Sequence, residues 1–187
     1  IADKILDNKS YLRFVDGYCT PISDKDLLPW HTDQAYQGDE KNYKNFANPD
    51  HAYLKIFIYL TDTGPDNGCM SYIPQSHKIG YALRKGIYDN DLKYMPYYLL
   101  KELRTFVLEK KNNSYIVNFL NDKNIIKEFL DKTSFVEKRV DCKDFDYYSK
   151  AGDAIIFNEL GVHKASKTLY SERMVLRYLY TSKKNIF

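Results

Sequence analysis

The stretch AYLKIFIYL at residues 52–60 decides the fold class, because its side chains alternate as they do along a β-strand. One face is purely apolar, with Leu54, Ile56, Ile58 and Leu60, and the other is mixed, with Tyr53, Lys55, Phe57 and Tyr59. We expect the apolar face to lie in a core and the mixed face to line a pocket. The turn-forming TDTGPDNG at 61–68 follows, and CMSYIP then resumes an extended run. The segment is therefore predicted to form a strand, a turn and a second strand.

Outward from this unit, strands are predicted at both ends of the chain and helices in the middle. Apolar residues spaced by three and four between about 89 and 132 predict two amphipathic helices, separated by a loop at 110–114. The run 135–140 is expected to be extended. We predict one domain over residues 1–187, a mainly β, closed or two-sheet antiparallel structure with a helical insertion at about 89–132.

Composition excludes several classes of protein. The chain has 187 residues and a net charge of +3 without a basic tract, so we expect neither nucleic acid nor a membrane as partner. The apolar runs are too short to cross a bilayer and no signal peptide is evident, so we expect a soluble, cytoplasmic protein. Three scattered cysteines without a CxxC pair predict neither a disulfide framework nor a thiolate zinc site. Any metal must use other ligands.

His31 and Asp33 form the tripeptide HTD, the first candidate for chemistry. Positions i and i+2 of a strand share a face, so the imidazole and the carboxylate can reach one ion. His163, which is 163 − 31 = 132 residues downstream in a loop after AGDAIIF, is the best third ligand. Two histidines and one carboxylate bind iron(II) with open positions for a co-substrate and dioxygen. An isolated HxD also occurs by chance, on a surface strand with a satisfied histidine.

Three blocks of sequence together resemble one family. LPWHTDQAY, IYLTDTGPDNGCMSYIPQSHK and AGDAIIFNELGVHKASKTLYSERMVLRYLY occur in this order, and they resemble the phytanoyl-CoA dioxygenase-like (PhyH) family of iron(II)- and 2-oxoglutarate-dependent oxygenases. The resemblance implies a double-stranded β-helix (jelly-roll, cupin-like) fold. It also implies that His31, Asp33 and His163 are the catalytic iron ligands, with iron(II) as the metal and 2-oxoglutarate as the co-substrate.

The resemblance further assigns the co-substrate contacts. Arg173, ten residues beyond the second histidine, is implied to bind the distal carboxylate of 2-oxoglutarate, which suits a planar guanidinium that never loses its charge. Arg177 lies on the same strand face and is the alternative. Phe57 aligns with the position that packs against the co-substrate. Ser166 lies near a position that often supplies a hydroxyl, although the aligned residue is Ala165.

Two further positions of the family pattern receive structural roles. Gly68 is expected to meet a positive φ requirement in the turn. His77 lies in PQSHK, where Gln75 replaces the glycine of the family's PGSHK, and we expect it to be a structural hydrogen-bonding residue and not a ligand. His51 is expected to be exposed.

The reaction implied by the resemblance is hydroxylation of a small organic molecule, with release of succinate and CO2. Asp33 favours hydroxylation, because related halogenases have a small residue in its place. The partners are then a small-molecule substrate and dioxygen. Two alternatives stay open at the level of sequence: a non-catalytic β-barrel binding module, and a cupin-type metalloenzyme that does not use 2-oxoglutarate.

Overall fold

The fold is described from a computed structural model, which describes residues 1–33, 53–94 and 98–182. The strands are β1 (Tyr11–Thr20), β2 (Leu28–His31), β3 (Tyr53–Tyr59), β4 (Met70–Tyr72), β5 (Asp146–Tyr147), β6 (Ala154–Asn158), β7 (His163–Ala165) and β8 (Arg173–Thr181). The helices are α1 (Ala2–Ile5), α3 (Ser76–Tyr88), α4 (Leu100–Leu108), α5 (Lys110–Leu120), α6 (Ile125–Lys132) and α7 (Phe135–Lys138). None of the helices described here is long and apolar enough to cross a membrane.

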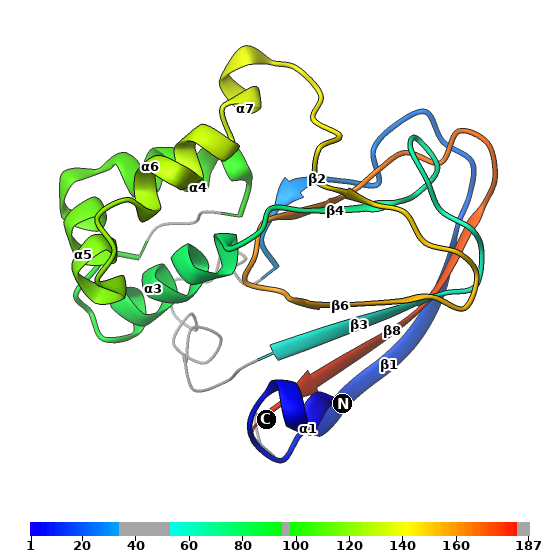
Figure 1. Cartoon of the computed structure of the whole chain (residues 1–187), viewed down its shortest axis with the longest axis horizontal. Coiled ribbons are helices and arrows are strands. Elements are labelled where there is room, and N and C mark those ends of the chain that lie inside the picture. The colour runs from blue at the N-terminus through cyan, green and yellow to red at the C-terminus, as the bar shows by residue number, and fades with distance from the viewer. Residues whose placement is uncertain (34–52, 95–97, 183–187) are drawn as a thin grey trace.

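The strands form two antiparallel sheets that face one another, as the sequence predicts (Figure 1). One sheet has the order β1-β8-β3-β6 and the other has the order β2-β7-β4-β5. Helices α3 to α7 gather at one end of the two sheets (Figure 1). Helices and strands contribute similar numbers of residues, so the prediction of a mainly β chain is wrong in its proportions.

The helical region is longer than the predicted insertion at 89–132. It begins with α3 at Ser76 and ends with α7 at Lys138, so the predicted strand at 135–140 is largely a short helix. The predicted loop at 110–114 is the first part of α5. Its polar residues lie mostly on exposed positions, and the helix is retained because Asn112 and Ile116 are buried against its neighbours. A polar run on an amphipathic helix therefore resembles a loop when it is read alone.

Two apolar clusters stabilise the chain. The larger lies among the helices and is continuous with the ends of the strands beside them; it includes Ile79, Leu83, Leu103, Phe106, Ile116, Phe129 and Val162. The smaller lies between the sheets and consists of Phe57, Tyr59, Met70, Phe157 and Val175. The space between the sheets is therefore not filled by aliphatic core alone, and polar side chains share it.

One of the two faces of β3 differs from the prediction: the mixed face lines the interior, as predicted, but the apolar face does not. The mixed face turns inward, with Lys55, Phe57 and Tyr59 all buried. The apolar face turns outward, because Ile56 and Ile58 are only half-buried and Leu60 is 46% exposed. Of the apolar face only Leu54 is buried. The prediction that the apolar face lies in a core is therefore wrong. The interior that β3 faces contains a polar site, which the mixed face lines.

Candidate metal and co-substrate site

The two histidines of the proposed triad are cross-strand partners. His31 is the last residue of β2 and His163 is the first residue of β7, and the two stand opposite each other in the ladder. Opposed side chains of an antiparallel pair lie close together, and here the ring centroids are 4.4 Å apart. His163 therefore lies on a strand. The sequence analysis predicted a loop at this position, and that prediction is wrong.

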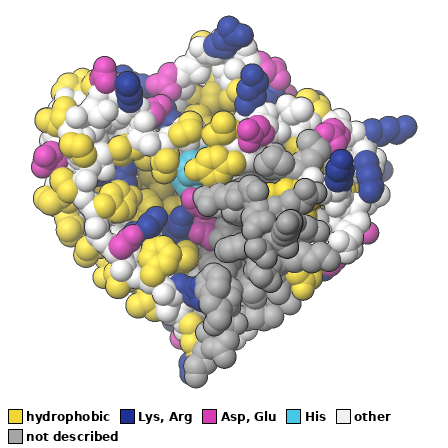
Figure 2. Space-filling view, turned by 180° about the vertical axis from the view of Figure 1, so that it is seen from behind, with side chains coloured by type: hydrophobic (Ala, Val, Ile, Leu, Met, Phe, Trp, Pro, Cys, Tyr) yellow, Lys and Arg dark blue, Asp and Glu magenta, His cyan; other side chains and the backbone are white. Residues whose placement is uncertain are grey.

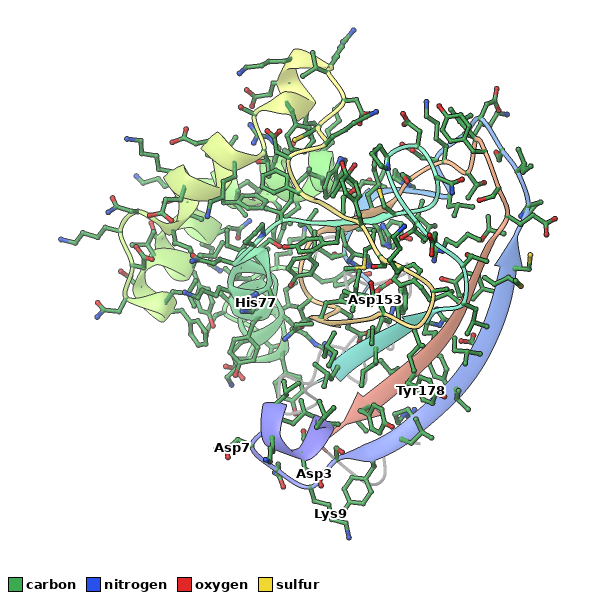
Figure 3. The ribbon with its side chains drawn as sticks, turned by 45° about the vertical axis from the view of Figure 1, so that its right-hand side comes forward. Asp3, Asp7, Lys9, His77, Asp153 and Tyr178 are labelled. Atoms are coloured by element: carbon green, nitrogen blue, oxygen red, sulfur yellow. The ribbon has the colours of Figure 1, made fainter. Side chains whose placement is uncertain are left out.

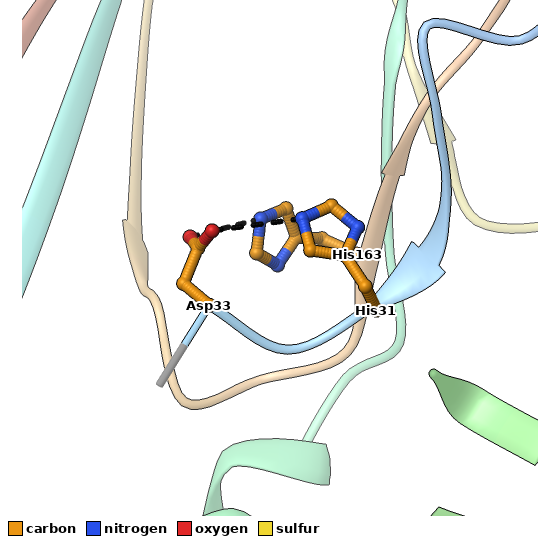
Figure 4. A group of neighbouring side chains, drawn as sticks. All are labelled: His31, Asp33 and His163. Carbon is orange, nitrogen blue, oxygen red and sulfur yellow. Dashed lines mark ion pairs between the residues drawn. The ribbon is translucent and has the colours of Figure 1, made fainter. Parts of the chain in front are cut away.

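Asp33 reaches the two histidines from a turn. Strand β2 ends at His31, so alternation along a strand does not explain the geometry of HTD. The backbone N–H of Asp33 donates to the carbonyl oxygen of Glu159 at 3.2 Å, and that of Thr32 donates to the carbonyl oxygen of Tyr98 at 2.9 Å. These bonds hold the turn so that the carboxylate faces both rings (Figure 4).

Backbone carbonyl groups orient both rings. Nδ1 of His31 lies 2.6 Å from the carbonyl oxygen of Pro29, and Nδ1 of His163 lies 2.9 Å from that of Gly161. A carbonyl oxygen only accepts, so each Nδ1 carries a proton and Nε2 is the nitrogen left to bind a metal. This second hydrogen bond is the usual means by which metal-binding histidines are oriented.

Three electron-pair donors therefore converge on one point. Nε2 of His31 lies 3.5 Å from Oδ1 of Asp33, and Nε2 of His163 lies 3.2 Å from Oδ2. One ligand atom from each residue falls within 4.8 Å of the others. Nε2 of His31 is buried without a hydrogen-bond partner among the described residues. Two ring nitrogens and a carboxylate that converge in this way fit a cation at their centre.

The charge of Asp33 is maintained by its surroundings. Burial raises the pKa of this carboxyl, but the rings of His163 and His31 and the positive charge of Lys55 outweigh burial and hold the pKa well below its usual range. Asp33 is therefore an anion at neutral pH. Two nitrogen donors and one carboxylate match the ligand set of non-haem iron(II) sites.

A buried lysine and a buried glutamate adjoin the triad. Lys55 lies on the face of β3 that was predicted to line a pocket, whereas Glu159 was assigned no role from the sequence. Nζ of Lys55 contacts Oδ2 of Asp33 and lies 3.4 Å from Oε2 of Glu159. Burial raises the pKa of Glu159 to about 7, against the opposing charges of Lys55 and Arg84. Figure 2 shows histidine, acidic and basic side chains close together on one face of the molecule, bordered by apolar ones.

Arg173 and Arg177 have different surroundings, although both point inward from β8. Arg177 is paired through Nε and Nη2 with the carboxylate of Asp16, at 2.9 and 2.5 Å. Arg173 is 2% exposed, and its Nη2 donates to the hydroxyl of Tyr18 at 2.7 Å. Nε and Nη1 of Arg173 are buried without a hydrogen-bond partner within the described part of the chain. Such groups are costly to leave unpaired, so they fit a bound anion.

Gly68 gives Arg173 its room. Its φ is +74°, as the sequence predicts for this turn, and a Cβ on this residue would lie 2.7 Å from Cδ of Arg173. The turn after β3 thus packs its backbone directly on the arginine. Only glycine combines the left-handed conformation with this close approach.

The other predicted site residues are placed as follows. Phe57 lies on the inner face, with its ring edge-on to Phe157 at 5.2 Å, and Oγ of Ser166 is buried 3.4 Å from Sγ of Cys69. Their roles toward a co-substrate stay predictions. His77 lies on α3 (Figure 3) and is not one of the three residues of the candidate metal group. His51 is outside the described residues.

Comparison with known proteins agrees with this geometry. The family profile of phytanoyl-CoA dioxygenase (PhyH) matches residues 17–171, which is most of the chain. No curated protein matches the sequence.

Solved structures resemble the fold at low sequence identity. HygX from Streptomyces hygroscopicus, solved with nickel and 2-oxoglutarate bound, has a TM-score of 0.52 and 17% identity over 96% of this chain and 59% of HygX. EvdMO1 has a TM-score of 0.52 and 14% identity over 98% of this chain and 30% of its own. SnoK, a non-haem α-ketoglutarate-dependent carbocyclase from nogalamycin biosynthesis, has a TM-score of 0.50 and 17% identity over 96% of this chain and 53% of SnoK.

The chain therefore spans from under a third to about three fifths of these proteins. They share with it the two-sheet jelly-roll architecture of 2-oxoglutarate oxygenases. With the family profile covering most of its length and the histidine–aspartate–histidine group at its centre, the chain belongs to the phytanoyl-CoA dioxygenase (PhyH) family of iron(II)- and 2-oxoglutarate-dependent oxygenases.

Proposed function

We propose that this protein hydroxylates a small organic molecule, using iron(II), 2-oxoglutarate and dioxygen and releasing succinate and CO2. The observation that carries the proposal is the pairing of two features within one interior. A convergent set of two imidazoles and one carboxylate fits a divalent metal. A buried arginine with two unpaired N–H groups fits a carboxylate.

In this proposal His31, Asp33 and His163 hold the metal. The bound iron and 2-oxoglutarate together supply the oxidising chemistry, and the protein supplies binding, orientation and exclusion of water. The carbonyl oxygens of Pro29 and Gly161 bind Nδ1 of both imidazoles and so leave Nε2 of each ring to coordinate the metal. Retention of the carboxylate at Asp33 supports hydroxylation in preference to halogenation.

Arg173 is proposed to bind the distal carboxylate of 2-oxoglutarate. Its guanidinium is held by the Tyr18 hydroxyl and by the faces of the Tyr18 and Tyr59 rings, at 5.4 and 5.9 Å from the ring centroids. The two free N–H groups are then oriented before the ligand arrives, which reduces the entropy lost on binding. Phe57 and Ser166 are proposed to line the same co-substrate site.

The test is formation of succinate from 2-oxoglutarate by the purified chain with iron(II) and dioxygen. We expect succinate release in the wild type, and its loss in His31→Ala, Asp33→Ala and His163→Ala with a fall in metal affinity of more than about 100-fold, since loss of an outer-shell group alone costs 10- to 100-fold. His77→Ala is the matched control, because that histidine lies outside the triad.

The same assay separates the alternatives. Metal binding with no affinity for 2-oxoglutarate would favour the cupin-type metalloenzyme, and absence of both would favour a binding module. Full metal content in any of the three ligand variants would contradict the assignment of the metal site.

A further inference from the structure

Lys55 is a cation in an unusual position. Its side chain is buried on the inner face of β3, and its ammonium lies between the carboxylates of Asp33 and Glu159. The oxygen of Asp33 that it contacts is also the one 3.2 Å from Nε2 of His163. The ammonium is therefore separated from the metal-binding nitrogens by a single carboxylate.

A metal at the triad would change the electrostatic environment of the Lys55 ammonium. This step rests on the proposed function. A divalent cation on Asp33 takes much of the negative charge that Lys55 now faces, and adds positive charge a few ångströms away. Glu159 is shared, because Arg84 also acts on it electrostatically. A buried ammonium that loses part of its counter-charge is costly unless another anion arrives.

The two arginines on the inner face of β8 are already assigned to other anions. Arg177 and Asp16 neutralise one another, and the proposed function assigns Arg173 to the distal carboxylate of the co-substrate. Lys55 is thus the cation on the described inner face that adjoins the metal and is partnered by the metal's own ligand. An anion that is bound beside the metal on the Asp33 side would restore its balance.

We propose that Lys55 is an anion-binding residue of the loaded site, which recognises a carboxylate presented beside the metal. Its flexible stem and compact charge suit a ligand atom whose position is set by the metal and not by the lysine. The carboxylate has two chemical sources: the proximal end of 2-oxoglutarate, or an acidic group on the substrate. The first source makes Lys55 a co-substrate residue, and the second makes the substrate an acid.

The experiment compares Lys55→Gln with wild type by anaerobic calorimetric titration of the manganese-loaded protein. The probes are 2-oxoglutarate, pyruvate, which has only the proximal carboxylate, and acetate added to protein saturated with 2-oxoglutarate. Lys164→Gln is the matched control, because Lys164 is also buried and its Nζ lies between two carboxylates, 3.3 Å from Asp26 and 3.1 Å from Asp141.

If Lys55 binds the proximal carboxylate, Lys55→Gln weakens 2-oxoglutarate and pyruvate by the same factor, on the order of tenfold or more. If it binds a substrate acid, both affinities are unchanged and acetate binding to the loaded protein is lost. In either case metal affinity is unchanged or higher, since a competing cation has been removed. Lys164→Gln changes none of these affinities.

Weaker metal binding with unchanged anion affinities would overturn the proposal, because Lys55 would then only position Asp33. Unchanged affinity for every probe would overturn it too. If Lys55→Gln does not fold, Lys55→Arg keeps the charge with a different reach, and unaltered affinity for all three anions would contradict the assignment. If the wild type binds metal but neither 2-oxoglutarate nor pyruvate, the proposed function is wrong. In that case, acetate binding to the metal-loaded protein that is lost in Lys55→Gln would still support the anion site. Acetate binding that is unchanged in Lys55→Gln would overturn it.

Discussion

Two arginines four residues apart on β8 show how strongly a single residue's surroundings decide its role. Arg177 already has a carboxylate partner in Asp16, whereas Arg173 has a tyrosine hydroxyl and two buried N–H groups without a partner among the described residues. The sequence presents both as inward arginines on one strand face. Only the position of Asp16 on β1, opposite Arg177 in the ladder, separates them.

We expect Arg173→Ala to weaken 2-oxoglutarate by roughly 2–5 kcal/mol with metal affinity nearly unchanged, the usual cost of removing one member of a buried charge pair. Arg173→Lys should restore only part of this, because one ammonium cannot replace the fork. Arg177→Ala is the control and should cost much less. Anaerobic titration of iron-loaded protein measures all three variants. A larger loss in Arg177→Ala would exchange the roles of the two arginines.

Glu159 predicts a dependence of stability on pH in the metal-free protein. Its pKa is raised from 4.5 to about 7 by burial, so between these values the folded state binds more protons than the unfolded state. Stability contributed by the protonated acid is therefore lost as pH rises from 4.5 to 7. We expect the free energy of unfolding to fall by up to roughly 3 kcal/mol in this window relative to Glu159→Gln.

Denaturant unfolding with a chelator present, at several pH values, measures this difference. Glu128→Gln, at an exposed position of α6, is the control and should follow the wild type throughout. Parallel curves for wild type and Glu159→Gln would show that Glu159 has an ordinary pKa.

At the scale of elements, the turn between β3 and β4 links the fold to the site. Its backbone supports Arg173 through Gly68, and two other glycines offer matched comparisons. Gly64, in the same turn, has no atom within 4 Å of its ideal Cβ. Gly152 has a positive φ of +96° but also has open space around it. Alanine substitutions at the three positions therefore distinguish the cost of a positive φ from the cost of a steric clash between the new methyl group and Arg173.

We expect Gly68→Ala to destabilise the protein by about 1–3 kcal/mol and to weaken 2-oxoglutarate, because the methyl group displaces Arg173. Gly152→Ala should lose stability alone, and Gly64→Ala should be neutral within about 0.5 kcal/mol. Thermal melts combined with 2-oxoglutarate titration distinguish the three. Unchanged co-substrate affinity in Gly68→Ala would mean that Arg173 tolerates the shift or does not bind the ligand.

Prediction from sequence succeeded where local patterns decide the structure. The alternation of β3 and the positive φ of Gly68 were available from the residues, and the three residues that the family resemblance implies as ligands do lie together. Glu159 and Tyr98 were missed, because their proximity to the triad depends on backbone pairing with the turn at 32–33. The mixed face of β3 was correctly predicted to line a pocket, but the apolar face was wrongly placed in a core, because alternation alone does not show what covers the second side of a sheet.

At the scale of the whole molecule, the proposed metal links residues on β2 and β7, which lie before and after the helical region in the sequence. A ligand that binds only the folded state stabilises it by about 2.7 kcal/mol at one hundred times its Kd. For a chain of this length we expect a rise in Tm of roughly 5–10 °C on adding manganese, reversed by chelator. Differential scanning fluorimetry measures the shift. His31→Ala should show none, and an equal shift in that variant would place the ion elsewhere.

The pairing of His31 with His163 also bears on how the protein folds. The two residues are 163 − 31 = 132 positions apart in the sequence, and the helical region lies between them. Contacts of such long sequence separation form slowly, because a large loop must close first. The metal centre is therefore expected to be assembled after the local α-helices, and appearance of metal affinity during refolding would report the closure of the β2–β7 ladder.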